Sequence, residues 1–138
     1  MVVNLITPLT KKMNLYSDLY KDLTINPISE DLALKLDEEA VKESIKNLIL
    51  TDKGERLFQP NLGGNIRAML FENNTPATVK IVQDQIETII KQYEPRAELI
   101  DVQVTSNIDD YNMNVKIIFY VSNNQAPITV SVFLERTR

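Results

Sequence analysis

The stretch QYEPRAELIDVQV, residues 92–104, contains the point at which the spacing of the apolar residues changes. Before it, apolar residues recur every three to four positions, and after Pro95 they alternate with polar ones. The first spacing is typical of a helix with one buried face, and the second of a strand with one buried face. We therefore expect a helix to end near Tyr93 and a strand to begin directly after the proline.

Upstream of this stretch the sequence predicts a layer of helices. The clearest begins at Thr75 and Pro76, because threonine can cap a helix and proline is tolerated at its first position. A second helix is expected from Asp37, with Glu38 and Glu39 in the favourable first turn. A short helix fits the segment GGNIRAMLFE. The apolar stripes are Val41, Ile45, Leu48 and Ile49; Ile66, Met69 and Leu70; and Val79, Val82, Ile86, Ile89, Ile90 and Tyr93.

Downstream, three segments have apolar residues at every second position, which is typical of strands. They are Ile100, Val102 and Val104; Met113, Val115, Ile117, Phe119 and Val121; and Ile128, Val130, Val132 and Leu134. The polar turns SNIDDYN and SNNQAP separate them. Helices followed by strands predict an α+β fold, with the helices packed on one face of a small antiparallel sheet of at least three strands. If the last strand lies at a sheet edge, a partner's strand could add to it.

Residues 1–36 mix Pro8, Pro27, Asn14 and Asn26 with apolar residues that follow no sustained period. We interpret this segment as an extended N-terminal arm with a turn or two of helix, and residues 37–138 as a single α+β domain. The pair Tyr16 and Tyr20 fits either an anchor for the arm or local packing.

Composition excludes several kinds of chemistry. The chain has 138 residues, no cysteine and no histidine, and a net charge of −4. Disulfides, thiolate nucleophiles, histidine bases and the commonest metal ligands are therefore absent. We expect no metal, cofactor or small-molecule substrate, and the weak acidity gives no reason to expect nucleic acid or a membrane as a partner. The N-terminus does not resemble a secretory signal, and a soluble intracellular product is expected.

The charged junction at Glu94 and Arg96 has two readings. These residues could stabilise the angle between helix and sheet, with Arg96 pairing with a carboxylate or with the last helix carbonyls. They could instead bind a partner. Catalysis would need two carboxylates about 5 to 9.5 Å apart, as in glycoside hydrolysis. Glu55, Glu72 and Glu94 are the candidates, but spacing does not single out a pair.

The segment TDKGERLFQPNLGGN, residues 51–65, is predicted to be a loop. Gly54, Gly63 and Gly64 are typical turn residues, and the segment lacks the glycine patterns that hold a phosphate. We expect the aromatic side chains of Phe58 and Phe71 to belong to the core.

Together these motifs resemble the baseplate wedge proteins of contractile-tailed bacteriophages that initiate the tail sheath, which have relatives in type VI secretion baseplates. The resemblance covers roughly residues 14–134. The matching positions are Leu48, Thr51, Gly54, Arg56, Phe58, Pro60, Gly63, Leu70, Phe71, Glu72, Asn73, Thr75 and Pro76, followed by Tyr93, Glu94, Pro95 and Arg96. NLYSDL at residues 14–19 also resembles the opening of these proteins.

The resemblance implies a structural protein of the tail baseplate, assembled in the host cytoplasm, with other wedge proteins and the tail sheath protein as partners. It implies that Glu94, Pro95 and Arg96 dock on a helical bundle of wedge proteins. Ile128, Val130, Val132 and Leu134 would lie in the strand that receives the sheath. Gly54, Arg56, Phe58, Pro60, Gly63 and Phe71 would maintain the fold.

Some members of this family are labelled lysozyme-like, so a peptidoglycan hydrolase with paired carboxylates is the alternative. Glu72 and Glu94 would be its forced assignment. However, Arg67 and Arg96 lie near them in sequence, and positive charge lowers a carboxyl pKa, the wrong direction for a general acid. We therefore expect a protein that is not an enzyme.

Overall fold

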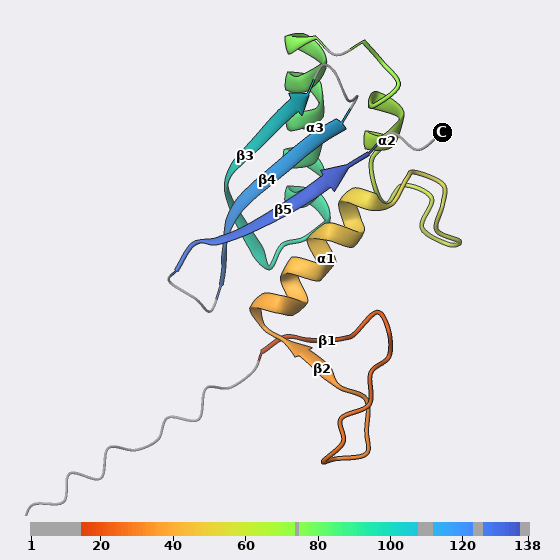
Figure 1. Cartoon of the computed structure of the whole chain (residues 1–138), viewed down its shortest axis with the longest axis vertical. Helices are drawn as coiled ribbons and strands as arrows, with labels where there is room; N and C mark the ends of the chain where they lie inside the picture. The colour runs from red at the N-terminus through yellow and green to blue at the C-terminus, as the bar shows by residue number, and fades with distance from the viewer. Residues whose placement is uncertain (1–14, 74, 108–111, 123–125, 136–138) are drawn as a thin grey trace, which may run out of the picture.

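A computed structural model describes residues 15–73, 75–107, 112–122 and 126–135. Its main body has two layers, a three-stranded antiparallel sheet and helices on one face of it (Figure 1). The strands are β3 (Ala97–Asn107), β4 (Asn112–Val121) and β5 (Ile128–Leu134), in the spatial order β3-β4-β5. The helices are α1 (Glu38–Leu50), α2 (Ile66–Met69) and α3 (Pro76–Tyr93). The predicted α+β architecture is confirmed.

The core lies between the sheet and the helices. In β4 and β5 the buried residues alternate strictly with less buried ones, as the sequence period predicts. The helical stripes meet this sheet face, so both periods bury their apolar side in one cluster. Its members include Val41, Ile45, Ile49, Val82, Ile86, Ile90, Val115, Ile117, Phe119, Val130 and Val132.

The two long helices begin where the sequence predicts, but by different means. Thr75 caps α3, since its hydroxyl accepts a hydrogen bond from the N–H of Thr78 at 3.2 Å. Asp37 precedes α1 but does not cap it with its side chain. Its carboxylate instead accepts hydrogen bonds from the N–H groups of Leu15 (2.8 Å) and Tyr16 (3.1 Å). Asp37 therefore ties the N-terminal segment to the body.

The first long strand departs from its predicted pattern at one residue. The register of β3 against β4 shifts between Leu99 and Asp101, which indicates a bulge at Ile100. Val102 is buried as expected, but the side chain of Ile100 is 48% exposed. The prediction that Ile100 shares the inward face is wrong, because one extra residue in a strand turns the following side chains over.

The loop after α1 confirms the expected glycine turns but not the expected aromatic packing. Gly63 has φ of 97°, and a β-carbon there would collide with the Thr51 carbonyl. The N–H of Gly54 donates to the Pro60 carbonyl at 2.9 Å and closes the loop. Phe58 lies within this closed loop, where it is 99% exposed. Phe71, in the turn after α2, is also exposed. The prediction that Phe58 and Phe71 join the core is wrong, because both side chains are carried outward by surface turns.

Residues 15–36 form a small ribbon that projects from the body below α1 (Figure 1). It contains two short antiparallel strands, β1 (Ser17–Leu19) and β2 (Leu34–Leu36). We call residues 15–36 the N-terminal ribbon. The expected turn of helix is absent from these described residues. Any structure in residues 1–14, and in the middle of the two polar turns between strands, lies outside the described part of the chain.

Candidate functional site

The charged junction is built around a buried carboxylate. Glu94 is 2% exposed and follows the last residue of α3. Arg96 holds it with two hydrogen bonds, from Nε to Oε1 at 2.5 Å and from Nη2 to Oε2 at 2.7 Å. The hydroxyl of Ser44, in α1, donates to Oε2 as well. Charged hydrogen bonds with this two-pronged geometry are among the strongest that side chains make.

This junction connects four parts of the fold. The main chain of Glu94 caps the end of α3: its N–H donates to the Ile90 carbonyl, and its own carbonyl accepts from the N–H of Ala97 in β3. Ser44 brings in α1. The guanidinium of Arg96 also lies over the ring of Tyr16 at 5.4 Å, which brings in the N-terminal ribbon. The pair therefore sets how α3, β3, α1 and the ribbon meet.

The electrostatics of the junction keep both partners charged. Burial by itself raises the pKa of Glu94, but hydrogen bonds from Arg96 and Ser44, together with the charge of Arg96, outweigh it. The net result is a Glu94 pKa below its ordinary value. The hydrogen bond with Glu94 raises the pKa of Arg96 against the smaller opposing effect of burial. A carboxylate held ionised in this way is a poor proton donor near neutral pH.

One side of the junction reaches the surface. Pro95 is exposed, and the Arg96 side chain is 32% exposed. A hollow of about 230 Å³ lies alongside, with Ser44 in its wall. Arg56, one of the residues expected to maintain the fold, is exposed and lines the same hollow together with Asp18. The surface beside Glu94 is therefore concave and carries charges of both signs.

The structure places the four predicted sheath residues in the core. The side chains of Ile128, Val130, Val132 and Leu134 are all buried, at most 5% exposed. Within the described sheet, β5 pairs with β4 on one side only. Contact with another protein at β5 would therefore use the backbone of an edge strand and not these side chains.

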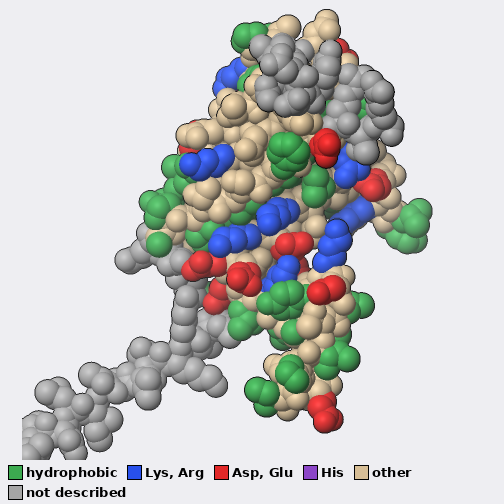
Figure 2. Space-filling model, viewed as in Figure 1, with side chains coloured by type: hydrophobic (Ala, Val, Ile, Leu, Met, Phe, Trp, Pro, Cys, Tyr) green, Lys and Arg blue, Asp and Glu red, His purple; other side chains and the backbone are tan. Residues whose placement is uncertain are grey.

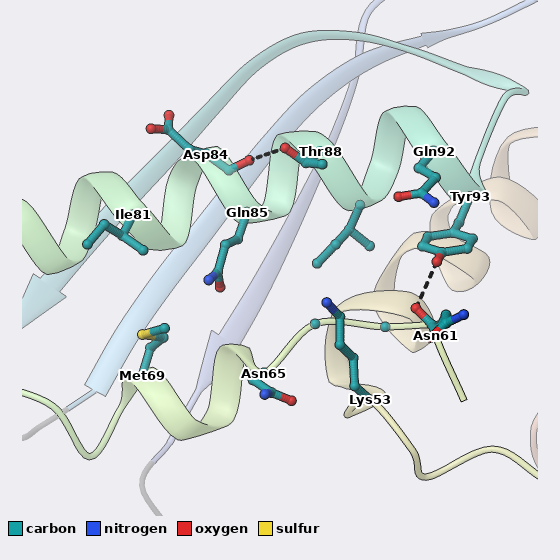
Figure 3. Close-up of a pocket in the computed structure, with 13 residues that line it drawn as sticks. Lys53, Asn61, Asn65, Met69, Ile81, Asp84, Gln85, Thr88, Gln92 and Tyr93 are labelled. Atoms are coloured by element: carbon teal, nitrogen blue, oxygen red, sulfur yellow. Dashed lines mark hydrogen bonds between the residues drawn. The ribbon is translucent and has the colours of Figure 1, made fainter. Parts of the chain in front are cut away.

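A larger cavity, of about 480 Å³, lies between α3 and the loop that leads into α2, with Tyr93 among its lining residues (Figure 3). Gln85 points into it, and its amide oxygen is buried without a described hydrogen-bond partner. The Tyr93 hydroxyl donates to the Asn61 carbonyl at its wall, at 2.7 Å. Asp84, the carboxylate among the lining residues, forms an ion pair with Lys80 at 2.9 Å.

The candidate catalytic carboxylates lie on three different segments: the loop after α1 (Glu55), the turn after α2 (Glu72) and the end of α3 (Glu94). Neither of the two hollows described above is lined by Glu55, Glu72 or Glu94. Glu72 is exposed in the turn after α2, whereas Glu94 is buried against α1. Glycoside hydrolysis needs a carboxylic acid and a second carboxylate facing one substrate, and neither of these hollows holds such a pair from the three residues.

No described helix combines the length and the apolar character needed to cross a membrane. The described acidic residues also form no group of three or more that could hold a metal ion.

Sequence reasoning missed Ser44 as a member of the junction, and it did not predict the contact between Tyr16 and Arg96. Ser44 gave no signal, because a serine on a partly buried helix face is ordinary and its partner lies 50 positions away. For Tyr16 the sequence left open an arm anchor or local packing, and in the structure Tyr16 packs against the core. Its contact with Arg96 follows from that packing.

The sequence of this chain matches a known protein family and a named relative. Residues 35–126 match the model of the family described as "Baseplate wedge protein gp25". A protein of that name from Enterobacteria phage T4 is 36% identical over 110 residues, which cover 80% of this chain and 83% of the relative.

Two solved structures share the fold at lower identity. A candidate tail lysozyme from Geobacter sulfurreducens has a TM-score of 0.69 and 21% identity, covering 77% of this chain and 96% of the other. A chain in the baseplate of the anti-feeding prophage has a TM-score of 0.61 and 22% identity, covering 89% of this chain and 87% of the other.

Proposed function

This chain belongs to the baseplate wedge protein gp25 family, and from that premise we propose that it docks on a helical bundle of wedge proteins and initiates assembly of the tail sheath. As a member of this family, it is a structural component of the tail baseplate of a contractile-tailed phage, and hence of the virion. There it associates with other baseplate proteins. The family match over most of the domain is the observation that carries this conclusion. We further propose that the protein is assembled into tails in the host cytoplasm.

Docking on the wedge bundle is assigned to the surface at Glu94, Pro95 and Arg96. Glu94 is too buried to contact a partner directly, so its part is to hold Arg96. Pro95, the exposed edge of Arg96 and the neighbouring hollow with Arg56 and Asp18 supply the contact surface. Because Glu94 already holds the Arg96 side chain in place, little side-chain freedom is lost when a partner binds, which favours binding.

Sheath initiation is assigned to β5. Main-chain hydrogen bonds are the usual source of affinity when a strand is added to a sheet edge. The buried side chains of Ile128, Val130, Val132 and Leu134 hold β5 against the helices, so its free edge is presented on a firm support. The first sheath subunits would extend the order β3-β4-β5 by one strand.

An enzymatic function finds no support in the site. The Geobacter structure shares the fold with this chain, and at 21% identity that likeness carries no activity with it. The low pKa of Glu94 and its burial against Ser44 oppose a role as general acid. We propose that the protein acts only through binding to other proteins.

The test is reconstitution. The full chain is co-expressed with the other wedge proteins, purified, and then mixed with the sheath protein. We expect the chain to copurify with the wedge at a fixed ratio, and sheath polymers to grow only from wedges that contain it. Sheath growth of equal rate from wedges without the chain would refute the initiator role, and failure to copurify would refute docking.

A further inference from the structure

The N-terminal ribbon exposes many of its large apolar side chains to solvent. Of the fourteen large hydrophobic side chains that are exposed among the described residues, eight lie between residues 15 and 36. They are Leu15, Leu19, Leu23, Ile25, Ile28, Leu32, Leu34 and Leu36. Single exposed apolar residues are normal on a protein surface, but a group of this size on one projecting element usually marks an interaction site. Figure 2 shows hydrophobic side chains gathered on the ribbon below α1.

The strand register shows which residues share a face. Leu19 pairs with Leu34, and Ser17 pairs with Leu36, so these four side chains lie on one side of the ribbon. Its leucines are 40–51% exposed. We call Leu19, Leu34 and Leu36 the leucine face.

The opposite side of the ribbon faces the body through a charged residue. Lys35 reaches Glu43 of α1 at 3.2 Å, and its side chain is only 14% exposed. The same ammonium lies over the ring of Tyr20 at 4.9 Å. The ribbon thus attaches to the body through the Lys35–Glu43 ion pair and the contact of Tyr16 with Arg96, and it turns its leucines to solvent. A segment that needed only to be stable alone would do the reverse.

We propose that the leucine face is the docking site for an amphipathic helix of another baseplate protein, one whose apolar stripe is flanked by lysine or arginine. Two points favour a helix over an added strand. The strands of the ribbon are three residues each, too short to offer a useful backbone edge. What the ribbon presents is instead a narrow row of leucine side chains, and two strands about 4.8 Å apart match the width of one helix stripe.

Charge selects the partner. Residues 15–39 contain seven acidic residues and two lysines. Asp22, Glu30 and Asp31 are exposed around the apolar tip of the ribbon. Two copies of so acidic a segment would repel one another, and an anionic membrane would be repelled as well. Basic side chains beside an apolar helix stripe would complement it.

This inference depends on the proposed baseplate role only for the assembly in which it is tested. A photo-crosslinking amino acid is placed at Leu34 in the full chain, and at Asn114 on the outer sheet face as a control. Baseplates assembled with each are irradiated, and the crosslinked peptides are identified. We expect position 34, and not position 114, to crosslink to a basic-flanked amphipathic helix of another protein. Crosslinks to a second copy, to a strand, or to nothing would overturn the proposal.

Substitutions in the leucine face provide a second test of the proposal. Leu19→Gln with Leu34→Gln changes side chains that are already exposed, so folding should persist, and Ile100→Gln is the matched control on the main sheet. We expect retention in the baseplate to weaken roughly ten-fold or more for the double variant, since two leucines lose their burial in the interface. Glu30→Lys with Asp31→Lys should weaken it too. Retention of the double variant at wild-type levels refutes only the leucine face, whereas absence of the wild-type chain from baseplates refutes the proposed function.

Discussion

Arg96 donates two hydrogen bonds to the carboxylate of Glu94, two positions earlier in the chain, from Nε at 2.5 Å and from Nη2 at 2.7 Å. The carboxylate is almost fully buried, while the guanidinium keeps one edge in solvent. Removing one member of such a pair is therefore not equivalent to removing both. Loss of the arginine leaves a buried charge without a partner, whereas loss of both leaves a neutral site.

The first prediction is a double-mutant cycle on this pair. Arg96→Met should lower the free energy of unfolding by roughly 2–4 kcal/mol, because Glu94 is left buried and unpaired. Glu94→Gln combined with Arg96→Met should be less destabilised than Arg96→Met alone. Urea unfolding of the wild type, the two single variants Glu94→Gln and Arg96→Met, and the double variant measures the coupling between the two residues. Additive losses would show that the pair does not act as a unit.

The second prediction concerns pH. The pKa of Glu94 is lowered in the folded state from a reference value of 4.5. The unfolded chain therefore binds a proton first as the pH falls, so the stabilisation from Glu94 is fully present above about pH 4.5 and is lost below it. We expect unfolding free energy to drop more steeply below that pH in the wild type than in Glu94→Gln. Identical slopes would mean that other carboxylates dominate the acid transition.

The third prediction separates docking from folding. Pro95 is exposed and makes no part of the ion pair. Pro95→Asp should leave the unfolding free energy within about 1 kcal/mol of the wild type, because it changes only backbone freedom and surface charge. It should nevertheless reduce copurification with the wedge proteins. Ala77→Asp, at an exposed position in the first turn of α3, is the control. Normal copurification of Pro95→Asp would argue that the junction serves the fold alone.

The fourth prediction tests the edge strand. Deleting β5 would uncover four core positions, so surface lysines make a cleaner probe. Thr129→Lys with Ser131→Lys changes exposed residues of β5, and lysines on an edge strand oppose the addition of another strand. We expect sheath growth to fail while wedge binding persists. Gln103→Lys with Thr105→Lys, on the opposite edge strand β3, should have no such effect. Equal loss from both pairs would indicate a general charge effect.

The fifth prediction compares two glycines in the loop after α1. Both have positive φ, but a β-carbon at Gly54 meets open space, whereas one at Gly63 meets the Thr51 carbonyl. Gly54→Ala should cost roughly 1 kcal/mol of stability from backbone strain. Gly63→Ala should cost about 2–3 kcal/mol or more, because the loop must also move. Thermal unfolding measures the difference, and similar losses would mean that the loop yields easily.

Much of the fold was predictable because each element carries its own period. The stripe from Val82 to Ile90 and the alternation from Met113 to Val121 mark their buried faces whatever they pack against. Thr75 and Pro76 mark a helix start by chemistry that acts within one turn. The bulge at Ile100 and the outward position of Phe58 were not predictable, since each depends on how a turn or a strand pair is closed by more distant residues.

The sequence by itself determined that Glu94 and Arg96 sit side by side at the junction of a helix and a sheet, and that the last strand has an apolar face. Only the tertiary structure decided that Ser44 completes the Glu94 site, that β5 lies at an edge, and that the ribbon turns its leucines outward. The physical reason is range. Periodicity and capping act over a few residues, whereas burial of a charge or exposure of a leucine depends on which distant element packs against it.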